Sequence, residues 1–134
     1  MDKDNLKITV LIAEDEVTNF IYIREVLKAF NLNILHAENG SEAVKMFKEN
    51  KDTIDLVLMD VKMPIMDGYQ ATLEIRKINS TIPIIAITAY ALAEEETRAM
   101  NAGCNQYVSK PVSKQTLYDI ILSYLDIQVK SKLL

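Results

Sequence analysis

Residues 56–60, Leu56-Val57-Leu58-Met59-Asp60, form an apolar run that ends directly at a carboxylate. Two further apolar runs end at charged side chains: ITVLI at residues 8–12 before Glu14 and Asp15, and YVS at residues 107–109 before Lys110. Short runs of this kind, rich in valine and isoleucine, are typical of parallel strands that are buried on both faces. Because parallel strands point the same way, their ends meet at one edge of the sheet, where ligands bind. We therefore expect these charged side chains to lie together.

Strand-like and helix-like segments alternate five times, which indicates an α/β fold with a parallel sheet. We expect strands near residues 8–13, 33–37, 55–59, 83–88 and 106–109. We expect helices near residues 18–30, 41–49, 92–102 and 113–125, and one more that starts at residues 67–68. Residues 39–41 and Ser113 are expected helix caps. Gly68 is expected to permit a close approach at a helix start.

Length and composition are those of one globular domain. The chain has 134 residues, of which 49% are hydrophobic and 25% charged, enough for a full core. We assign residues 1–134 to a single domain, with a core at about 8–125 and short tails at 1–6 and 127–134. The net charge of -4 argues against a nucleic-acid-binding domain, which carries a basic patch. No apolar run approaches the about 18 residues of a membrane span, and the single Cys104 suits a reducing compartment, so we expect a cytoplasmic protein.

The charged side chains at the expected strand ends suit a metal ion and an anion. Three crowded carboxylates, those of Glu14, Asp15 and Asp60, repel one another unless a cation lies among them. Carboxylate oxygens are typical ligands of hard divalent cations such as Mg²⁺ or Mn²⁺. Lys110 at the same edge supplies a positive charge for an anionic group. The set predicts a site where a metal and a phosphoryl group meet at one carboxylate.

Four segments in this order, each at an expected strand end, resemble the receiver domain of two-component response regulators. They are Glu14-Asp15-Glu16, residues 58–68 (LMDVKMPIMDG), residues 87–90 (ITAY) and residues 107–111 (YVSKP). The resemblance covers roughly residues 8–125, and the stretch 59–68 is most similar to receivers of hybrid histidine kinases. It implies a flavodoxin-like (βα)5 three-layer sandwich with a five-stranded parallel sheet. The strand order 2-1-3-4-5 is that of the receiver fold itself and is taken over from the family.

The resemblance implies that Asp60 accepts a phosphoryl group from a phosphohistidine of a histidine kinase or phosphotransfer domain. Asp15 is expected to bind Mg²⁺ directly, and Glu14 directly or through water. Asp60 and the backbone carbonyl of Lys62 complete the expected protein ligands. Such a domain is a signalling phospho-acceptor and not an enzyme in the usual sense, because it catalyses only its own phosphorylation and slow dephosphorylation.

The family also implies roles for residues further along the chain. Lys110 is expected to pair with a phosphoryl oxygen, or with Asp60 before transfer, and the bond before Pro111 is expected to be cis. Thr88 is similar to the switch hydroxyl that donates to the phosphoryl group, and Tyr107 to the switch aromatic. Plainer explanations exist for both, since threonine suits a strand and an aromatic at that position is more often simple packing.

The expected output surface is the face of the fourth helix, fifth strand and fifth helix, at residues 93–100, 107 and 112–118. We expect it to bind a partner, such as a second copy of the chain in a homodimer or a kinase domain. No contact of this domain with nucleic acid or membrane is expected. The sequence leaves open the cognate kinase, the output, the phosphate lifetime, and whether the domain stands alone or belongs to a hybrid kinase.

Three other functions compete with this interpretation. An aspartyl-phosphate hydrolase of the haloacid dehalogenase type needs a second acid two residues after its nucleophile, where this chain has Lys62. A flavodoxin needs a neutral phosphate loop after its first strand, whereas residues 14–16 are acidic and would repel phosphate. A receiver-like module that no longer turns over phosphate remains as the third alternative. His36, the single histidine, falls on the expected edge strand and is not assigned as a phosphohistidine relay.

Overall fold

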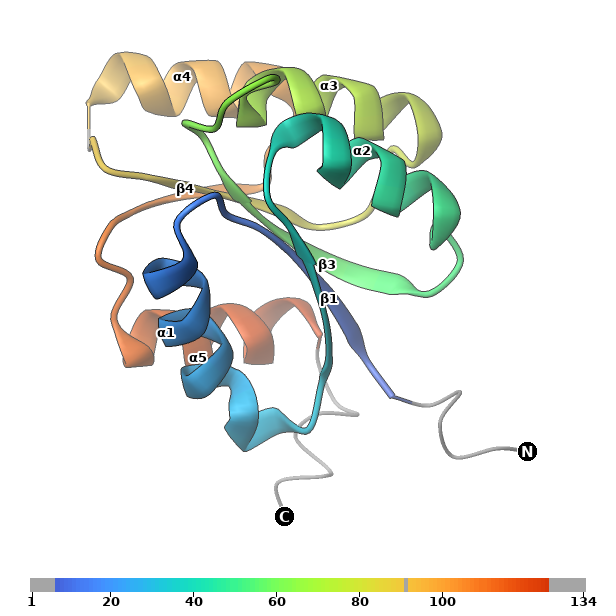
Figure 1. The fold of residues 1–134 in the computed structure, drawn as a ribbon. Coiled ribbons are helices and arrows are strands. Elements are labelled where there is room, and N and C mark those ends of the chain that lie inside the picture. The colour runs from blue at the N-terminus through green and yellow to red at the C-terminus, as the bar shows by residue number, and fades with distance from the viewer. Residues whose placement is uncertain (1–6, 91, 126–134) are drawn as a thin grey trace.

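The computed structural model describes residues 7–90 and 92–125, and it confirms the alternation of strands and helices (Figure 1). The strands are β1 (Thr9–Ala13), β2 (Asn33–Ala37), β3 (Ile54–Asp60), β4 (Ile84–Thr88) and β5 (Gln106–Ser109). The helices are α1 (Val17–Leu27), the 3₁₀ turn η2 (Lys28–Phe30), α2 (Gly40–Glu49), α3 (Gly68–Ile78), α4 (Ala93–Ala102) and α5 (Lys114–Tyr124). The tails expected at 1–6 and 127–134 lie outside the described residues. Within the described ranges, no helix is long and apolar enough to cross a membrane.

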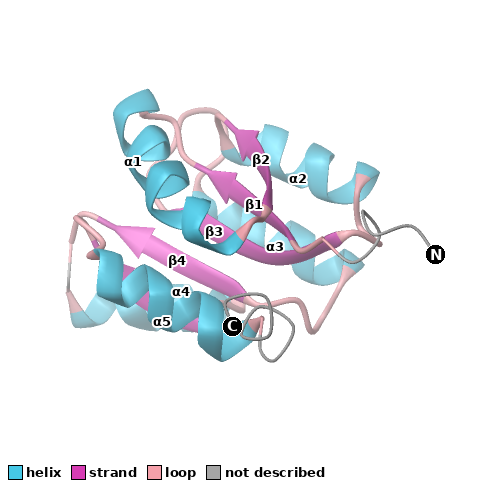
Figure 2. Cartoon of the chain, turned by 90° about the horizontal axis from the view of Figure 1, so that it is seen from below, coloured by secondary structure: helices cyan, strands magenta, loops and turns pink. Residues whose placement is uncertain are grey.

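All five strands are parallel and follow the expected order β2-β1-β3-β4-β5. Figure 2 shows β2, β1, β3 and β4 side by side in this order. Every residue of β1 and β4 is buried, which explains why these two strands are apolar almost throughout. The register sets Ala13 beside Met59 and Thr88 beside Ser109, so neighbouring strands end level with one another. The side chains at and just after these strand ends therefore meet at one edge of the sheet.

Helices cover both faces of the sheet, so the fold is the three-layer sandwich that the resemblance implied. α1 and α5 pack on one face, and α2, α3 and α4 pack on the other (Figure 1). Leu117 of α5 lies in the core of the first face and Phe47 of α2 in the core of the second, and both are fully buried. Each such side chain contributes about 1.5–3 kcal/mol to folding stability. The two cores therefore hold the strand ends in place around the site.

Polar caps begin the helices that follow β2, β3 and β5. The side chains of Asn39, Asp67 and Ser113 each accept a hydrogen bond from the backbone N–H three residues later, at 2.8, 2.9 and 3.0 Å. Each cap satisfies one of the N–H groups that a helix start leaves without a partner. The caps predicted at residues 39–41 and at Ser113 are confirmed.

The first helix ends earlier than predicted. Regular α-helix stops at Leu27, and residues 28–30 form the tighter turn η2. Asn31 then takes a left-handed conformation with φ of 52°, which ends the helix. The tighter turn still buries Phe30, so the apolar spacing predicted the buried residues correctly and the end of the α-helix about one turn too late.

Gly68 begins α3 where the helix touches the end of β3. A Cβ at this position would lie 2.3 Å from the carbonyl oxygen of Asp60 and 2.9 Å from Cα of Val61. The Gly68 N–H donates to the Val61 carbonyl at 2.8 Å. The close approach expected from the glycine is confirmed, and it anchors both ends of the loop that runs past the sheet edge.

Candidate functional site

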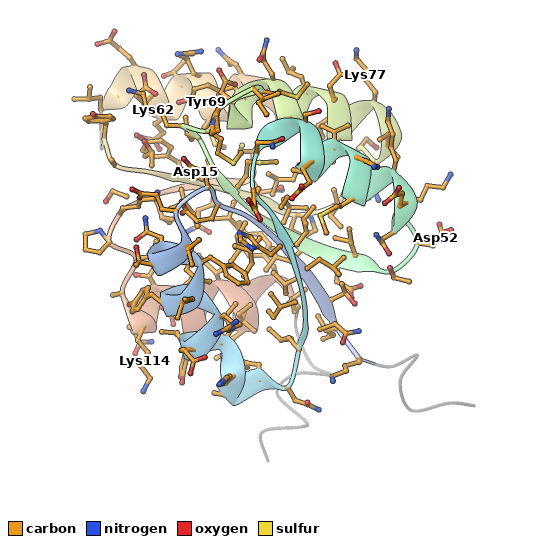
Figure 3. All side chains as sticks on the ribbon, in the orientation of Figure 1. Asp15, Asp52, Lys62, Tyr69, Lys77 and Lys114 are labelled. Carbon is orange, nitrogen blue, oxygen red and sulfur yellow. The ribbon has the colours of Figure 1, made fainter. Side chains whose placement is uncertain are left out.

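Carboxylates that follow β1 and end β3 meet at the C-terminal edge of the sheet. Oxygen atoms of Glu14, Asp15 and Asp60 lie within 4.8 Å of one another. Glu14 and Asp60 are 1% and 3% exposed, whereas Asp15 is open to solvent. Figure 3 shows Asp15 just beyond β1, far from Asp52 at the other end of the sheet. Two buried acids and one exposed acid therefore share this site.

Lys110, which follows β5, bridges the two buried acids. Its Nζ lies 3.1 Å from Oε1 of Glu14 and 3.2 Å from Oδ2 of Asp60. Its backbone N–H donates to the Thr88 carbonyl at 2.6 Å, which ties the residue to the end of β4. The peptide bond between Lys110 and Pro111 is cis, as the resemblance implied.

The surroundings of Asp60 and Lys110 shift the proton affinity of both side chains. Burial and the negative charge of Glu14 raise the pKa of Asp60 to about 7, although Lys110 acts in the opposite direction. Burial lowers the pKa of Lys110, but the charges of Asp60 and Glu14 outweigh this effect and leave the pKa above its ordinary value. One lysine therefore leaves part of the negative charge of the cluster uncompensated.

This charge balance fits a divalent cation. The three carboxylates offer oxygen ligands within a small volume, which is the donor type that Mg²⁺ takes in proteins. A cation beside Asp60 would favour its ionised form and so offset the effect of burial. The N–H of Lys62 points to Oδ1 of Asp60 at 3.4 Å, and the use of the Lys62 carbonyl as a further ligand stays a prediction.

Most of the predicted site residues line one cleft of about 330 Å³. Its walls are formed by Asp15, Glu16, Asp60, Lys62, Thr88, Ala89, Tyr90 and Lys110. Thr88 is buried, and its Oγ1 accepts a hydrogen bond from the Tyr90 N–H at 3.2 Å. Glu14 joins this group through its ion pair with Lys110. The structure thus brings together all of the predicted acceptor and metal residues.

Tyr107 is the predicted residue that lies outside the cleft. It is half-buried on β5, and its hydroxyl donates to the backbone carbonyl of Tyr90. The Tyr90 ring in turn lies 5.3 Å from Nζ of Lys62, a cation–π contact across the cleft. Tyr107 therefore reaches the site through the loop after β4, and its role as a switch stays a prediction.

Sequence reasoning missed two residues of this site. Tyr90 belongs to residues 87–90, one of the segments on which the resemblance is based. Its position two residues after Thr88 could have indicated that it lines the site. His36 was set aside because of its edge strand, yet its Nε2 lies 2.8 Å from the Glu14 carbonyl oxygen. The sequence around His36 contains no pattern that predicts this contact.

A second polar cluster joins α3 to α4 beside the cleft. The hydroxyl of Tyr69 donates to Oε1 of Glu95 at 2.6 Å, and the guanidinium of Arg98 lies 4.3 Å from the Tyr69 ring centroid. Burial and this hydrogen bond raise the pKa of Tyr69, so the hydroxyl remains a donor. Figure 3 shows Tyr69 and Lys62 near each other, at the side of the molecule where α4 begins. The cluster holds the first turns of α4 against α3.

Comparison with known proteins agrees with this arrangement. A family model described as response regulator receiver domain matches residues 10–122. The two-component response regulator ORR41 of Oryza sativa subsp. japonica is 39% identical over 119 residues, which cover 87% of this chain and 94% of that protein. Hybrid signal transduction histidine kinase I of Dictyostelium discoideum is 36% identical over 119 residues, which cover 84% of this chain and 7% of that protein. The chain therefore spans a small part of the hybrid kinase and nearly all of the response regulator.

Solved structures show the same fold. One is the complex of the Saccharomyces cerevisiae histidine phosphotransfer signalling protein Ypd1 with the receiver domain of its downstream response regulator Ssk1. The match has a TM-score of 0.82 and 31% identity, and covers 88% of each chain. The described part of this chain thus has the size and topology of a receiver domain.

Proposed function

This chain belongs to the response regulator receiver domain family, and we propose that its Asp60 accepts a phosphoryl group from a phosphohistidine of a histidine kinase or phosphotransfer domain. The observation that carries the proposal is the buried Asp60 carboxylate, held 3.2 Å from Lys110 and beside two further acids. The domain is a signalling phospho-acceptor whose own catalysis is limited to its phosphorylation and slow dephosphorylation.

The side chains around the cleft each have a part in this transfer. A carboxylate oxygen of Asp60 forms the new P–O bond while the P–N bond of phosphohistidine breaks, and the electron pair of that bond stays on the imidazole nitrogen. Lys110 already contacts Oδ2 of Asp60, so its ammonium is placed to pair with a phosphoryl oxygen. The Thr88 hydroxyl, which accepts from Tyr90, keeps its own proton to donate to another phosphoryl oxygen.

The residues that would hold Mg²⁺ or Mn²⁺ are Glu14, Asp15, Asp60 and, through its backbone carbonyl, Lys62. Receiver domains bind Mg²⁺ at an acidic pocket, and the crowded carboxylates of this chain fit that ion. When bound, the cation supplies positive charge that offsets the negative charge of the carboxylates and phosphoryl oxygens.

We further propose that phosphorylation signals through the face of α4, β5 and α5, made of Ala93–Met100, Tyr107 and Val112–Tyr118. Two hydrogen bonds support this path: Tyr90 donates its N–H to Thr88, and its carbonyl accepts from the Tyr107 hydroxyl. When the Thr88 hydroxyl turns towards a phosphoryl group, the loop that holds Tyr107 loses one of its attachments. A shift of about 1–3 kcal/mol in a pre-existing equilibrium is enough for a useful signal.

The proposed partners follow from the same family. The Ssk1 receiver was solved with a histidine phosphotransfer protein, which supports a phosphotransfer domain or kinase as the donor for this chain. A homodimer through the face of α4, β5 and α5 is the second proposed partner. Binding of nucleic acid or membrane by this domain is not proposed, since the net charge is -4. We place the domain in the cytoplasm because its single cysteine suits a reducing compartment.

Acetyl phosphate, a small phosphodonor, tests the acceptor directly. Intact-mass spectrometry should show one added phosphoryl group in Mg²⁺, and none in EDTA or in the Asp60→Asn variant. Asp55→Asn is the matched control, because Asp55 is an exposed carboxylate at the other end of the same strand. Modification that persists without Asp60, or that ignores the chelator, contradicts the assignment. A chain that is never modified would instead support the receiver-like module without phosphate turnover.

Beryllofluoride, a phosphoryl mimic, tests the switch. In NMR spectra of the Mg²⁺-loaded chain it should move the amide signals of α4 and of Tyr107 as well as those around Asp60. Thr88→Ala should reduce the distant changes while Asp60 is still modified by acetyl phosphate. Signals that change only in the loops around Asp60 would leave an acceptor without this output.

A further inference from the structure

His36 reaches from the edge strand β2 to the turn that carries the acids. Its Nε2 lies 2.8 Å from the backbone carbonyl oxygen of Glu14. Its ring stacks on Phe20 of α1, with centroids 3.7 Å apart and planes 6° from parallel. Arg24 lies over the Phe20 ring, 5.6 Å from its centroid. The stack fixes the plane of the imidazole, so that its Nε2 edge stays directed at the turn after β1.

The partner of this nitrogen determines where the His36 proton is. A carbonyl oxygen only accepts hydrogen bonds, so the contact with Glu14 requires a proton on Nε2. A ring that carried its only proton on Nδ1 would face the carbonyl with a lone pair and would be repelled. The geometry therefore assigns the Nε2–H form of the ring.

Both backbone groups of Glu14 are held by β2. Its N–H donates to the Ala37 carbonyl at 3.0 Å, and its carbonyl accepts from His36. The second of these bonds fixes the plane of the peptide that joins Glu14 to Asp15. In the described part of the chain, no hydrogen bond involves the Asp15 carboxylate, so the backbone alone sets the direction in which this side chain leaves the turn.

We propose that His36 is a positioning residue for the metal site. Its hydrogen bond to the Glu14 carbonyl orients the turn so that the carboxylates of Glu14 and Asp15 converge on Asp60. This inference rests on the metal-dependent function proposed above, and adds to it a residue that need touch neither the metal nor the phosphoryl group. Residues that orient metal ligands in this way affect metal affinity although they bind no metal.

Two substitutions separate the hydrogen bond from the ring stack. His36→Phe keeps a flat ring against Phe20 but removes the donor. His36→Gln loses the stack but places an amide N–H near the position of Nε2. Ile34→Ala is the matched control, because Ile34 lies on the same face of β2, packs in the core under α1 and α5, and is remote from the Glu14 carbonyl.

Mg²⁺ affinity is measured on the whole chain from NMR titration of the Asp15 and Glu16 amide signals. We expect His36→Phe to bind Mg²⁺ about three- to tenfold more weakly, the range for loss of one hydrogen bond. His36→Gln should stay within about twofold of the wild type, and Ile34→Ala should bind Mg²⁺ normally despite a lower melting temperature. A purely structural role would instead make metal affinity follow melting temperature across the three variants.

Two further measurements do not depend on bound metal. The ¹⁵N spectrum of the wild type should show the His36 proton on Nε2, and the Asp15 and Glu16 amides should exchange faster in His36→Phe than in His36→Gln. Normal Mg²⁺ binding by His36→Phe, no recovery in His36→Gln, or a proton on Nδ1 alone would each overturn the inference. A wild type that binds no Mg²⁺ would overturn the proposed function and with it the metal-site role of His36, and the exchange pattern would then show separately whether His36 orients the turn.

Discussion

Replacing Asp60 by asparagine should stabilise the metal-free protein, and the gain should grow as the pH rises. Burial and Glu14 raise the pKa of this carboxyl from 3.8 to about 7 in the folded chain. At about 1.4 kcal/mol per pKa unit, ionised Asp60 destabilises the fold by on the order of 4 kcal/mol at pH 8. Asparagine has the same size and no charge, so it removes this cost, in which the attraction of Lys110 is already included. We expect a net gain of about 2–4 kcal/mol at pH 8.

The dependence of folding stability on pH follows from the direction in which the pKa of Asp60 is shifted. A carboxyl with a raised pKa holds its proton longer in the native state, so folding stability falls as the pH rises from the unfolded value near 4 through the folded value near 7. Well below pH 4 both states are protonated and the effect is absent. The advantage of Asp60→Asn over the wild type should therefore widen by about 2–3 kcal/mol between pH 5 and pH 8.

Urea denaturation in EDTA at pH 5 and pH 8 measures the two free energies of unfolding, and a thermal melt at pH 8 should show a rise of about 6–10 °C for the variant. Asp52→Asn is the control, because Asp52 is exposed and no hydrogen bond or ion pair in the described part of the chain involves its side chain. We expect this variant to stay within about 0.5 kcal/mol of the wild type at both pH values. Saturating Mg²⁺ should narrow the difference, because it binds the ionised wild type. If the gap between Asp60→Asn and the wild type does not widen with pH in EDTA, the charge argument for this site is wrong.

Two further predictions concern the supports of the site. Gly68→Ala should lower the free energy of unfolding, measured by urea denaturation, by about 2–3 kcal/mol, because the new Cβ would overlap the Asp60 carbonyl. A loss below about 0.5 kcal/mol would contradict the close approach. Tyr69→Phe should lower the free energy of unfolding by about 1 kcal/mol and speed amide exchange in the first turn of α4, because Glu95 loses the hydrogen bond from the Tyr69 hydroxyl. Unchanged exchange in this turn would show that the cluster does not hold α4.

Most elements of the fold follow from residues close together in the chain. The apolar runs of β1 and β3 correctly predicted strands buried on both faces, whereas the same prediction for residues 107–109 is wrong, because β5 lies at the edge of the sheet and is only partly buried. Asn39 and Ser113 predicted helix starts, since a cap acts on N–H groups only a few residues away. The strand order came instead from the family resemblance. The end of α1 was predicted one turn late because apolar spacing reports which residues are buried, and it does not distinguish an α-helix from the tighter turn that follows.

The sequence by itself determined the residue types of the site and the edge at which they meet, because parallel strands that end in charged residues must present them together. Only the tertiary structure decided how they pair. Lys110 and Glu14 are 96 positions apart in the chain. The lysine bridges Glu14 and Asp60 because its backbone N–H donates to the Thr88 carbonyl at the end of β4, which keeps Lys110 at the same edge of the sheet as the two acids. His36 reaches Glu14 because a ring on α1 fixes its plane. Such contacts depend on strand register and side-chain rotamers across elements, which no local pattern of residues encodes.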